Sequence, residues 1–245
     1  MAKLAEQPAL TSVPLGQEMR MVAAFFGGAK DFFVEVGANE PQLRSQTFHL
    51  EQAGWTGVLI EPQPDLAEKL RAARQAQVFA VACSSPANAG QKLPFHVAGP
   101  LSSLNRERMV PGAAPATVVE VPVRTLDSVL EEAGAPAGFG FLSIDVEGHE
   151  LEVLSGFDFR RWRPRLILLE DHVGDLRKHR FLQASGYRLI RRFENNGWYV
   201  PGDSSAKMTS SDAWEIVRKY YLALPIRKLR NDGRRVRGKI KGDPA

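Results

Sequence analysis

Short apolar runs alternate with amphipathic segments along most of the chain. The apolar runs, which predict buried strands, cover residues 31–39, 57–62, 77–84, 138–146 and 164–172. The amphipathic segments, which predict helices, cover residues 45–54, 64–75, 126–134 and 149–157. Residues 186–201 read as two further strands around Asn195-Asn196-Gly197, a strong hairpin signal. This alternation predicts an α/β fold with a doubly wound, Rossmann-like sheet, mostly parallel and closed at one edge by an antiparallel C-terminal hairpin.

The pattern divides the chain into three regions. We expect a helical lead-in over residues 1–30, one α/β domain over residues 31–203 and a basic extension over residues 204–245. The 245 residues are 44% hydrophobic and 24% charged, the balance of an ordinary globular protein. The single cysteine, Cys83, excludes an internal disulfide framework and fits a reducing compartment. With no apolar stretch long enough to cross a bilayer and no signal-peptide pattern at the start, we expect a cytoplasmic protein.

Positive charge is concentrated at the C-terminal end. The net charge of the whole chain is +4, and residues 218–245 contain ten lysines and arginines against two aspartates. Apolar and aromatic residues between positions 220 and 226 accompany these charges, so the segment could lie peripherally on an anionic membrane, at its inner face. Nucleic acid is a less expected partner, and a solvated tail is the neutral alternative.

Two predicted strands end in polar residues at the edge where ligands of parallel sheets bind. The first strand leads into Glu35, Gly37 and Asn39, and the second ends in Glu61. Ligands of open parallel sheets lie beyond the carboxyl ends of the strands. An acid about 20 residues after a glycine turn is the position from which a ribose diol is bound. The spacing therefore suggests a nucleoside site, although any strand–glycine–helix turn followed by an acid would look the same.

The turn after Gly37 departs from the dinucleotide fingerprint. The second and third glycines are missing, because the chain continues with Ala38, Asn39, Glu40 and Pro41. A pyrophosphate needs close backbone approach at those points. Acids beside the turn favour instead a nucleoside that carries positive charge and no phosphate, and S-adenosylmethionine has these properties.

Four segments in this order resemble the FkbM family of S-adenosylmethionine-dependent methyltransferases. They are FFVEVGANE, GVLIEPQPDLAEKL, VPVRTLDSVL and FLSIDVEGHELEVLSGFD, within a match over about residues 31–201. The resemblance implies a class I methyltransferase fold and O-methylation of sugars in bacterial glycans or of natural-product hydroxyls. The chain departs from the family pattern at Glu35, where Asp is common, and at Glu40-Pro41.

The resemblance implies a role for Asp145, which ends the fourth parallel strand beside the expected methyl donor. This acid would face the amino group of the donor or the reacting centre. Glu150 begins the next helix, where it is expected to act as a capping residue. The donor contacts expected at the strand ends are Glu35, Gly37, Asn39, Glu61, Pro62, Cys83, Ser84 and Asp145.

O-methylation is helped by a general base, and histidine is the side chain best suited to neutral pH. His172 closes the fifth strand, and His149 follows Asp145 closely, so the expected catalytic residues are His172, Asp145 and His149. Contacts to the acceptor are expected from Glu147, Asp171 and Trp198. The strand-end acids could hold a divalent ion, but no metal site is assigned.

The leading hypothesis is a methyltransferase that acts on a sugar hydroxyl of a polysaccharide, lipopolysaccharide or glycolipid. A natural-product hydroxyl is the alternative acceptor, and a nicotinamide-dependent dehydrogenase is disfavoured by the missing glycines. The alternative of another class is a non-catalytic nucleic-acid or membrane-binding module on a degenerate methyltransferase fold. A homo-oligomer is left open.

Overall fold

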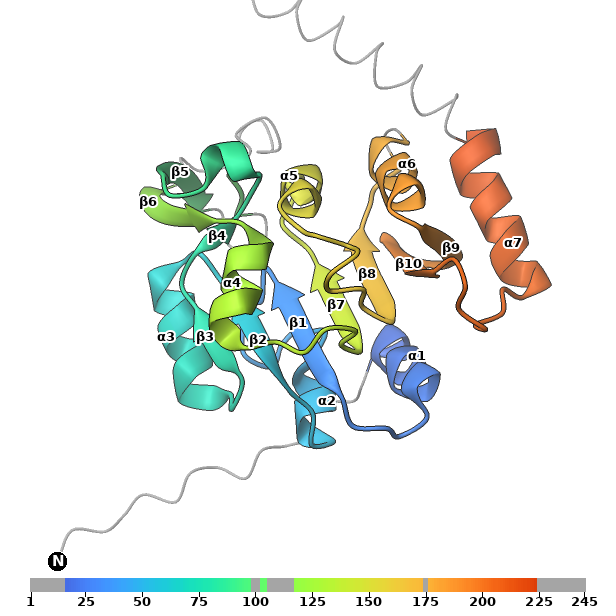
Figure 1. Ribbon diagram of the computed structural model, residues 1–245, viewed down its shortest axis with the longest axis horizontal. Coiled ribbons are helices and arrows are strands. Elements are labelled where there is room, and N and C mark those ends of the chain that lie inside the picture. The colour runs from blue at the N-terminus through green and yellow to red at the C-terminus, as the bar shows by residue number, and fades with distance from the viewer. Residues whose placement is uncertain (1–15, 98–101, 105–116, 174–175, 224–245) are drawn as a thin grey trace, which may run out of the picture.

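A seven-stranded sheet forms the centre of the molecule (Figure 1). The computed structural model describes residues 16–97, 102–104, 117–173 and 176–223. The strands, in their order across the sheet, are β3 (Gln77–Phe79), β2 (Thr56–Ile60), β1 (Phe32–Val36), β7 (Phe141–Ile144), β8 (Leu166–Glu170), β10 (Asn196–Pro201) and β9 (Tyr187–Phe193). Every pair from β3 to β8 is parallel, and β10 is antiparallel to both of its neighbours. The expected mostly parallel sheet with an antiparallel C-terminal hairpin is therefore confirmed.

Helices cover both faces of this sheet, as a doubly wound fold requires. They are α1 (Gln17–Phe26), α2 (Phe48–Gln52), α3 (Pro64–Ala73), α4 (Leu126–Ala133), α5 (Glu150–Ser155), α6 (Arg177–Ala184) and α7 (Ser210–Ile216). A 3-10 turn at Pro86–Asn88 and a π-helical segment at Val217–Leu222 complete the described helices. All residues of β7 and β8 are buried, which explains why these strands appear in the sequence as continuous apolar runs.

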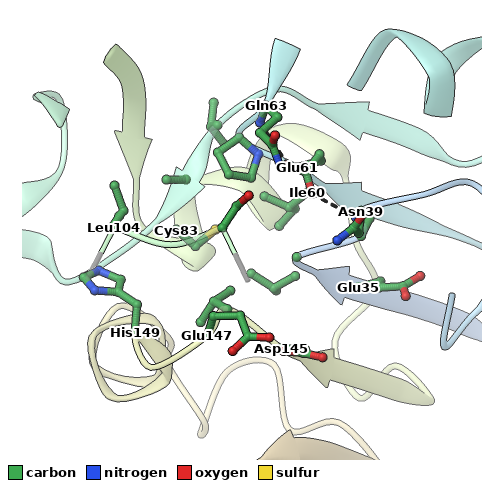
Figure 2. Close-up of a pocket in the computed structure, with 18 of the residues that line it drawn as sticks. Glu35, Asn39, Ile60, Glu61, Gln63, Cys83, Leu104, Asp145, Glu147 and His149 are labelled. Atoms are coloured by element: carbon green, nitrogen blue, oxygen red, sulfur yellow. Dashed lines mark hydrogen bonds between the residues drawn. The ribbon is translucent and has the colours of Figure 1, made fainter. Parts of the chain in front are cut away.

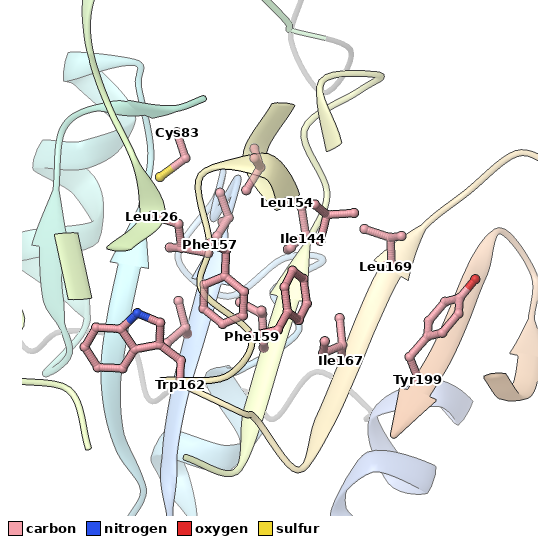
Figure 3. Close-up of a cluster of buried hydrophobic side chains, with 14 of the residues drawn as sticks. Cys83, Leu126, Ile144, Leu154, Phe157, Phe159, Trp162, Ile167, Leu169 and Tyr199 are labelled. Atoms are coloured by element: carbon pink, nitrogen blue, oxygen red, sulfur yellow. The ribbon is translucent and has the colours of Figure 1, made fainter. Parts of the chain in front are cut away.

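Alternate residues of a strand pack into two separate hydrophobic clusters, one on each face of the sheet. Val34 packs with α4, α5 and α6 in the larger cluster, shown in Figure 3, and Phe33 packs with α1, α2 and α3 in the other. Successive side chains of a strand point to opposite faces, so one sheet supplies both cores. The two cores fix the strands rigidly, and with them the edge where the strands end.

The predicted strand over residues 77–84 is wrong as a single element. Its first half is β3, whereas Ala82–Cys83 forms β4 in a second, three-stranded sheet with β6 (Thr117–Arg124) and β5 (Lys92–Val97). The chain leaves the main sheet between Phe79 and Ala82. Ala82 and Cys83 are buried, whereas Gln77 is exposed and Val78 and Phe79 are half-buried. The apolar run predicts strands but does not reveal that the two pieces pair with different partners.

The C-terminal hairpin turns two residues earlier than the sequence suggested. The loop is Glu194-Asn195, and Glu194 takes the positive φ of 45° that the turn requires. Asn196 and Gly197 already belong to β10. A Cβ at Gly197 would lie 2.8 Å from the ring of Tyr199, so this glycine makes room inside the strand.

Parts of the two flanking regions pack on the central domain. Val22 and Phe26 of α1 are buried in the same cluster as Phe33, and Tyr220 after α7 is buried in the other. The remainder of both regions, residues 1–15 and 224–245, lies outside the described residues. Within the described ranges, the helices are too short or too polar for any of them to cross a membrane.

Candidate functional site

A pocket opens where β1, β2 and β7 end, and part of the small sheet covers it (Figure 2). Ser103 holds the cover in place, because its backbone pairs with that of His96 and its Oγ donates to the carbonyl of Glu147 at 2.9 Å. The lining residues are Glu35, Val36, Gly37, Ala38, Asn39, Arg44, Gln46, Ile60, Glu61, Pro62, Gln63, Val81, Ala82, Cys83, Phe95, Ser102, Leu104, Ser143, Asp145, Val146, Glu147 and His149. The pocket thus brings together most of the side chains that the sequence singled out.

Glu35 projects from β1 and organises the loop that follows Gly37. Its carboxylate accepts hydrogen bonds from Ser45 Oγ at 3.0 Å, the Gln46 backbone N–H at 2.7 Å and Thr47 Oγ1 at 2.5 Å. Burial raises the pKa of Glu35, and the hydrogen bonds from Thr47 and Gln46 oppose this effect. Glu35 reaches the pocket edge, but its oxygens are already engaged in shaping the wall.

Gly37 is needed for contact between two strand ends. Its φ is +85°, and a Cβ built there would lie 1.9 Å from the carbonyl oxygen of Asp145. The glycine is therefore required by the close approach of the backbone after β7. Without a side chain at this position, the ends of β1 and β7 can form one continuous floor.

Glu61 ties the exits of β1 and β2 together. Its Oε2 accepts from the Asn39 backbone N–H at 2.8 Å, and its Oε1 accepts from the Gln63 backbone N–H at 2.9 Å. Burial raises the pKa of this carboxyl group, and both backbone hydrogen bonds lower it. Pro62 lies between these contacts and also lines the pocket. The Gln63 side chain also hydrogen-bonds to this carboxylate. Since a carboxylate has about four lone-pair sites, Glu61 can still accept a hydrogen bond from a ligand hydroxyl.

Asp145 lies at the floor of the pocket among other acids. The residue is exposed to the open pocket, and its side chain hydrogen-bonds to Glu170. Desolvation of the carboxyl group by the pocket walls, followed by the negative charges of Glu170 and Glu147, raises the pKa of Asp145 to about 8. The pKa of Glu170 is lowered, because hydrogen bonding and charge from His172 outweigh its burial. The two carboxyl groups therefore share a proton at neutral pH, held on Asp145.

Glu147 and Glu150 have separate tasks in the turn after Asp145. Glu147 adopts a φ of 51° and lines the pocket. Glu150 faces inward: its Oε1 accepts from the Gly148 backbone N–H at 2.7 Å, and its Oε2 accepts from Lys178 Nζ at 3.1 Å. The expected capping role of Glu150 is therefore wrong: the N-cap of α5 is His149, no side chain caps the helix, and Glu150 instead ties the preceding turn to Lys178.

His149 lines the far end of the pocket and is held by Ser84. Their Nε2 and Oγ atoms are 2.8 Å apart, and Asn88 Nδ2 donates to the same Oγ at 2.9 Å. The Ser84 hydroxyl proton is then available to His149 Nε2. Burial lowers the pKa of His149, so the ring is neutral at pH 7. Ser84 itself lies behind the lining, which corrects its expected donor contact to an indirect one, whereas Cys83 does reach the pocket.

Cys83 contributes an apolar surface to the pocket wall. Its side chain is buried, and burial raises the pKa of the thiol to about 12. The thiol is therefore protonated at physiological pH and has no nucleophilic character. Its place beside Ala82 and Phe95 makes this end of the pocket suitable for a flat, weakly polar group.

His172 stands one strand away from the pocket lining. Its Nε2 lies 3.1 Å from Glu170 Oε1, and its side chain is 42% exposed. Glu170 in turn bonds to Asp145, so a polar chain runs from the pocket floor to His172. Within the described ranges, donor atoms of Glu147, Glu170 and His172 lie within 4.8 Å of one another, a set that could hold a metal ion.

Two expected acceptor contacts are corrected by the structure. Asp171 is buried behind the strand end, where its Oδ2 accepts from Tyr220 at 3.0 Å and its Oδ1 from the Val173 backbone N–H at 3.0 Å. Trp198 is 1% exposed in the cluster that contains α1, and its Nε1 donates to Glu18 at 2.9 Å. The position of Trp198 follows from strand alternation: each side chain of β10 points to one face of the sheet, and Trp198 points to the face that α1 covers.

Arg44 and Gln46 are pocket residues that the sequence did not reveal. Arg44 takes a φ of +64°, and it is the arginine among otherwise acidic charged groups of the lining. Gln46 Oε1 is buried and has no hydrogen-bond partner among the described residues. Both residues come several positions after the end of β1. Arg44 lies just before the predicted helical segment 45–54, and Gln46 lies within it. No local signal distinguishes them from ordinary loop and helix residues.

Comparison with known proteins agrees with this architecture. The family model for the methyltransferase FkbM domain matches residues 35–189. No curated protein matches the chain. A crystal structure of methyltransferase FkbM from Methylobacillus flagellatus KT shares 15% identity with a TM-score of 0.44, covering 70% of this chain and 43% of that one. Monomeric WbdD shares 13% identity with a TM-score of 0.45, covering 78% and 42%.

A third solved structure, precorrin-6y C5,15-methyltransferase from Geobacter metallireducens GS-15, shares 11% identity with a TM-score of 0.41, covering 78% of this chain and 90% of that one. The chain spans less than half the length of the first two structures. The mostly parallel main sheet, its antiparallel C-terminal hairpin and the match to the methyltransferase domain model confirm the expected class I, Rossmann-like methyltransferase fold. Since the domain match extends over well more than half of the 245 residues, the protein belongs to the FkbM methyltransferase family.

Proposed function

We propose that the protein is an S-adenosylmethionine-dependent O-methyltransferase that methylates a sugar hydroxyl of a bacterial glycan. The observation that carries the donor assignment is the acidic pocket at the ends of β1, β2 and β7. The acceptor class comes from the resemblance to the family and is the part that experiment must establish.

The charge of the pocket supports a cationic nucleoside as the donor. Its lining contains Glu35, Glu61, Asp145 and Glu147 against Arg44. A dinucleotide would bring two phosphate charges into this field, which is unfavourable in a partly desolvated site. S-adenosylmethionine brings an ammonium group and a sulfonium instead. Both are attracted by ionised acids of the lining, and their charge favours ionisation of Asp145, which holds a proton at neutral pH without a ligand.

An unsatisfied acceptor supports the same fit. Gln46 Oε1 is buried at the pocket edge without a partner among the described residues, and buried polar atoms rarely remain so. An ammonium group of the donor would satisfy it. Glu61 can accept from a ribose hydroxyl, and the apolar end near Phe95 and Leu104 suits the adenine ring.

The reactive part of the site would use Asp145 and its neighbours. S-adenosylmethionine supplies a methyl carbon on positively charged sulfur. Asp145 accepts the proton of the acceptor hydroxyl once its carboxyl group is ionised, and the Glu170–His172 pair provides an onward path for that proton. His149 is held by Ser84 and positions the pocket end.

Binding measurements provide the first test of the donor. Calorimetry should detect S-adenosylmethionine and S-adenosylhomocysteine, and NAD should give no heat. Gln46→Met should weaken the binding of both S-adenosyl ligands about tenfold, the value of one hydrogen bond to a charged group, without loss of stability. Absence of any affinity for either S-adenosyl ligand would favour a non-catalytic module and refute the proposal.

Turnover measurements test the acceptor and the base. Candidate saccharides and natural-product alcohols are screened with labelled donor, and transfer to the alcohols alone would reject the sugar assignment. His172→Ala should lower kcat about tenfold or more with little change in donor affinity. His96→Ala serves as the matched control, because its side chain is outside the lining and the change leaves its backbone pairing with Ser103 intact.

The proposal assigns no metal, and a chelator tests this point. Dialysis against EDTA should leave kcat unchanged. Activity that is lost and then restored by magnesium would instead put an ion on Glu147, Glu170 and His172, whose donor atoms are close enough for one.

A further inference from the structure

The C-terminal helix is fixed to the domain by its inner face. Tyr220 is 1% exposed and donates a hydrogen bond to Asp171 Oδ2 at 3.0 Å, and Ile216 packs against the larger cluster. At the other end, Thr209 and Asp212 form a capping box, and Arg191 Nε donates to Asp212 Oδ1 at 2.9 Å. The helix therefore has one defined orientation, and its outer face is equally defined.

The outer face is exposed and carries four large hydrophobic side chains beside Arg218, whose side chain is 51% exposed. Trp214 is 61% exposed, Val217 40%, Tyr221 58% and Leu222 55%. Their spacing over α7 and the π-helical segment puts them on the side opposite Ile216 and Tyr220. These four are among seven large hydrophobic side chains exposed in the described part of the chain, so the exposure is concentrated rather than scattered. We call the four side chains the outer helix face.

The chain continues from this face into its most basic segment. Residues 224–245 contain eight lysines and arginines and two aspartates, a surplus of six that exceeds the net charge of the whole chain. An apolar, aromatic face followed directly by such a segment combines the two signals that stable binding to a membrane surface needs. Nucleic acid would use the charges but gains nothing from an exposed Val217 and Leu222.

We propose that the outer helix face binds the surface of an anionic lipid bilayer, which the positive charge that the sequence places after residue 223 would attract. Trp214 and Tyr221 suit the headgroup region, where an aromatic ring with a polar edge is favoured. Leu222 and Val217 enter the acyl boundary, and the basic segment meets the lipid charge. This contact is independent of the proposed donor and acceptor.

The test uses the full chain and vesicles of phosphatidylcholine and phosphatidylglycerol in equal parts, with phosphatidylcholine vesicles as reference. Trp214 is a built-in reporter, because Trp55, Trp162 and Trp198 are at most 4% exposed. We expect co-sedimentation with the anionic vesicles and a blue shift of tryptophan emission. Added salt should weaken the binding, as screening of surface charge requires.

Matched variants distinguish binding through the outer helix face from non-specific hydrophobic binding of the protein to vesicles. Tyr221→Ser combined with Leu222→Ser should lower the vesicle partition constant about tenfold or more. Leu43→Ser combined with Val118→Ser removes exposed apolar side chains elsewhere, 61% and 51% exposed, and should leave it unchanged. Arg234→Glu with Arg235→Glu and Arg237→Glu should abolish the preference for anionic lipid.

Three outcomes would overturn the proposal. The first is wild-type partitioning of the Tyr221→Ser, Leu222→Ser variant. The second is binding to duplex DNA but not to vesicles, with that variant unaffected, which would assign the basic segment to nucleic acid. The third is a concentration-dependent dimer in sedimentation velocity that the same variant dissolves, without vesicle binding, which would assign the face to a second copy of this chain.

Discussion

A single missing side chain allows the floor of the pocket to form. Gly37 and the Asp145 carbonyl are in such close contact that any Cβ would overlap the oxygen, and the positive φ of Gly37 adds a further cost for L-residues. Gly90 has nearly the same φ, +81°, but no atom within 4 Å of its built Cβ. A side chain at Gly90 would therefore cost stability through backbone conformation alone, whereas one at Gly37 would also collide with the Asp145 carbonyl oxygen.

Gly37→Ala should lower the free energy of unfolding by about 3 kcal/mol or more, because the ends of β1 and β7 must move apart. Gly90→Ala should cost about 1 kcal/mol, the conformational part alone. Urea unfolding of both variants measures the difference. Equal losses would mean that the contact at Asp145 contributes nothing.

Asp145 is a residue at which function and stability oppose each other. The folded protein holds this proton up to about pH 8, whereas an ordinary aspartate, with a pKa of 3.8, has released it well below neutrality. Between these two values the folded state binds more protons than the unfolded state, so the contribution of Asp145 to stability falls as pH rises. Above about pH 8 the full cost of the ionised group is present.

Asp145→Asn should therefore be more stable than the wild type at pH 9 and show no such advantage at pH 4. The same change should weaken donor binding or turnover about tenfold or more, because an amide can neither ionise beside a cationic donor nor accept the proton of the acceptor hydroxyl. Thermal unfolding across pH and calorimetry with S-adenosylhomocysteine check the two halves. A stability difference independent of pH would refute the raised pKa, and unchanged donor binding and turnover would remove Asp145 from the site.

At the scale of elements, contacts between distant segments decide which strands and helices belong together. α1 and β10 are joined through Glu18, which accepts from Asn196 Nδ2 at 2.6 Å and from Trp198 Nε1 at 2.9 Å. Burial raises the pKa of Glu18, and these two hydrogen bonds oppose that rise. The first described helix is thereby attached to the last strand of the sheet.

Glu18→Ala should cost about 1–3 kcal/mol, because it leaves the buried Trp198 N–H without an acceptor. Glu18→Gln keeps one oxygen acceptor and should recover part of that loss. The measurement is chemical denaturation monitored by near-ultraviolet circular dichroism, to which buried tryptophans such as Trp198 contribute. Equal stability of the alanine and glutamine variants would mean that this hydrogen bond does not hold α1 in place.

At the scale of the whole molecule, charge is divided between two places. The pocket is acidic, while the surplus of positive charge lies at the C-terminal end of the chain. A cationic nucleoside and an anionic surface would thus be bound by different parts of the same protein without competing. This separation is consistent with both proposals and makes them testable independently.

S-adenosylhomocysteine at about 100 times its Kd should raise the free energy of unfolding by about 2.7 kcal/mol. For a chain of this size the Tm should rise by about 5–10 °C, and NAD at the same concentration should leave it unchanged. Differential scanning fluorimetry compares the two ligands. A larger shift with NAD would overturn the donor assignment while leaving the membrane proposal intact.

The sequence by itself determined the alternation of strands and helices, the hairpin, the family and several of the polar residues that line the pocket. Burial of both sheet faces produces continuous apolar runs, which predict the strands. Because the carboxyl ends of parallel strands meet at one edge of the sheet, the sequence alone predicts that Glu61 and Asp145 lie close together. These are local patterns, and each is a property of a few consecutive residues.

Only the tertiary structure decided what each side chain faces. Cys83 belongs to a second sheet, and Trp198 packs against α1. Asp171 is buried against Tyr220, and Arg44 and Gln46 line the pocket. The reason is physical: a strand or loop residue has two or more directions to point in, and contacts with segments far away in the chain select one. That selection also raises the pKa of Asp145, because its acidic neighbour Glu170 comes from another strand.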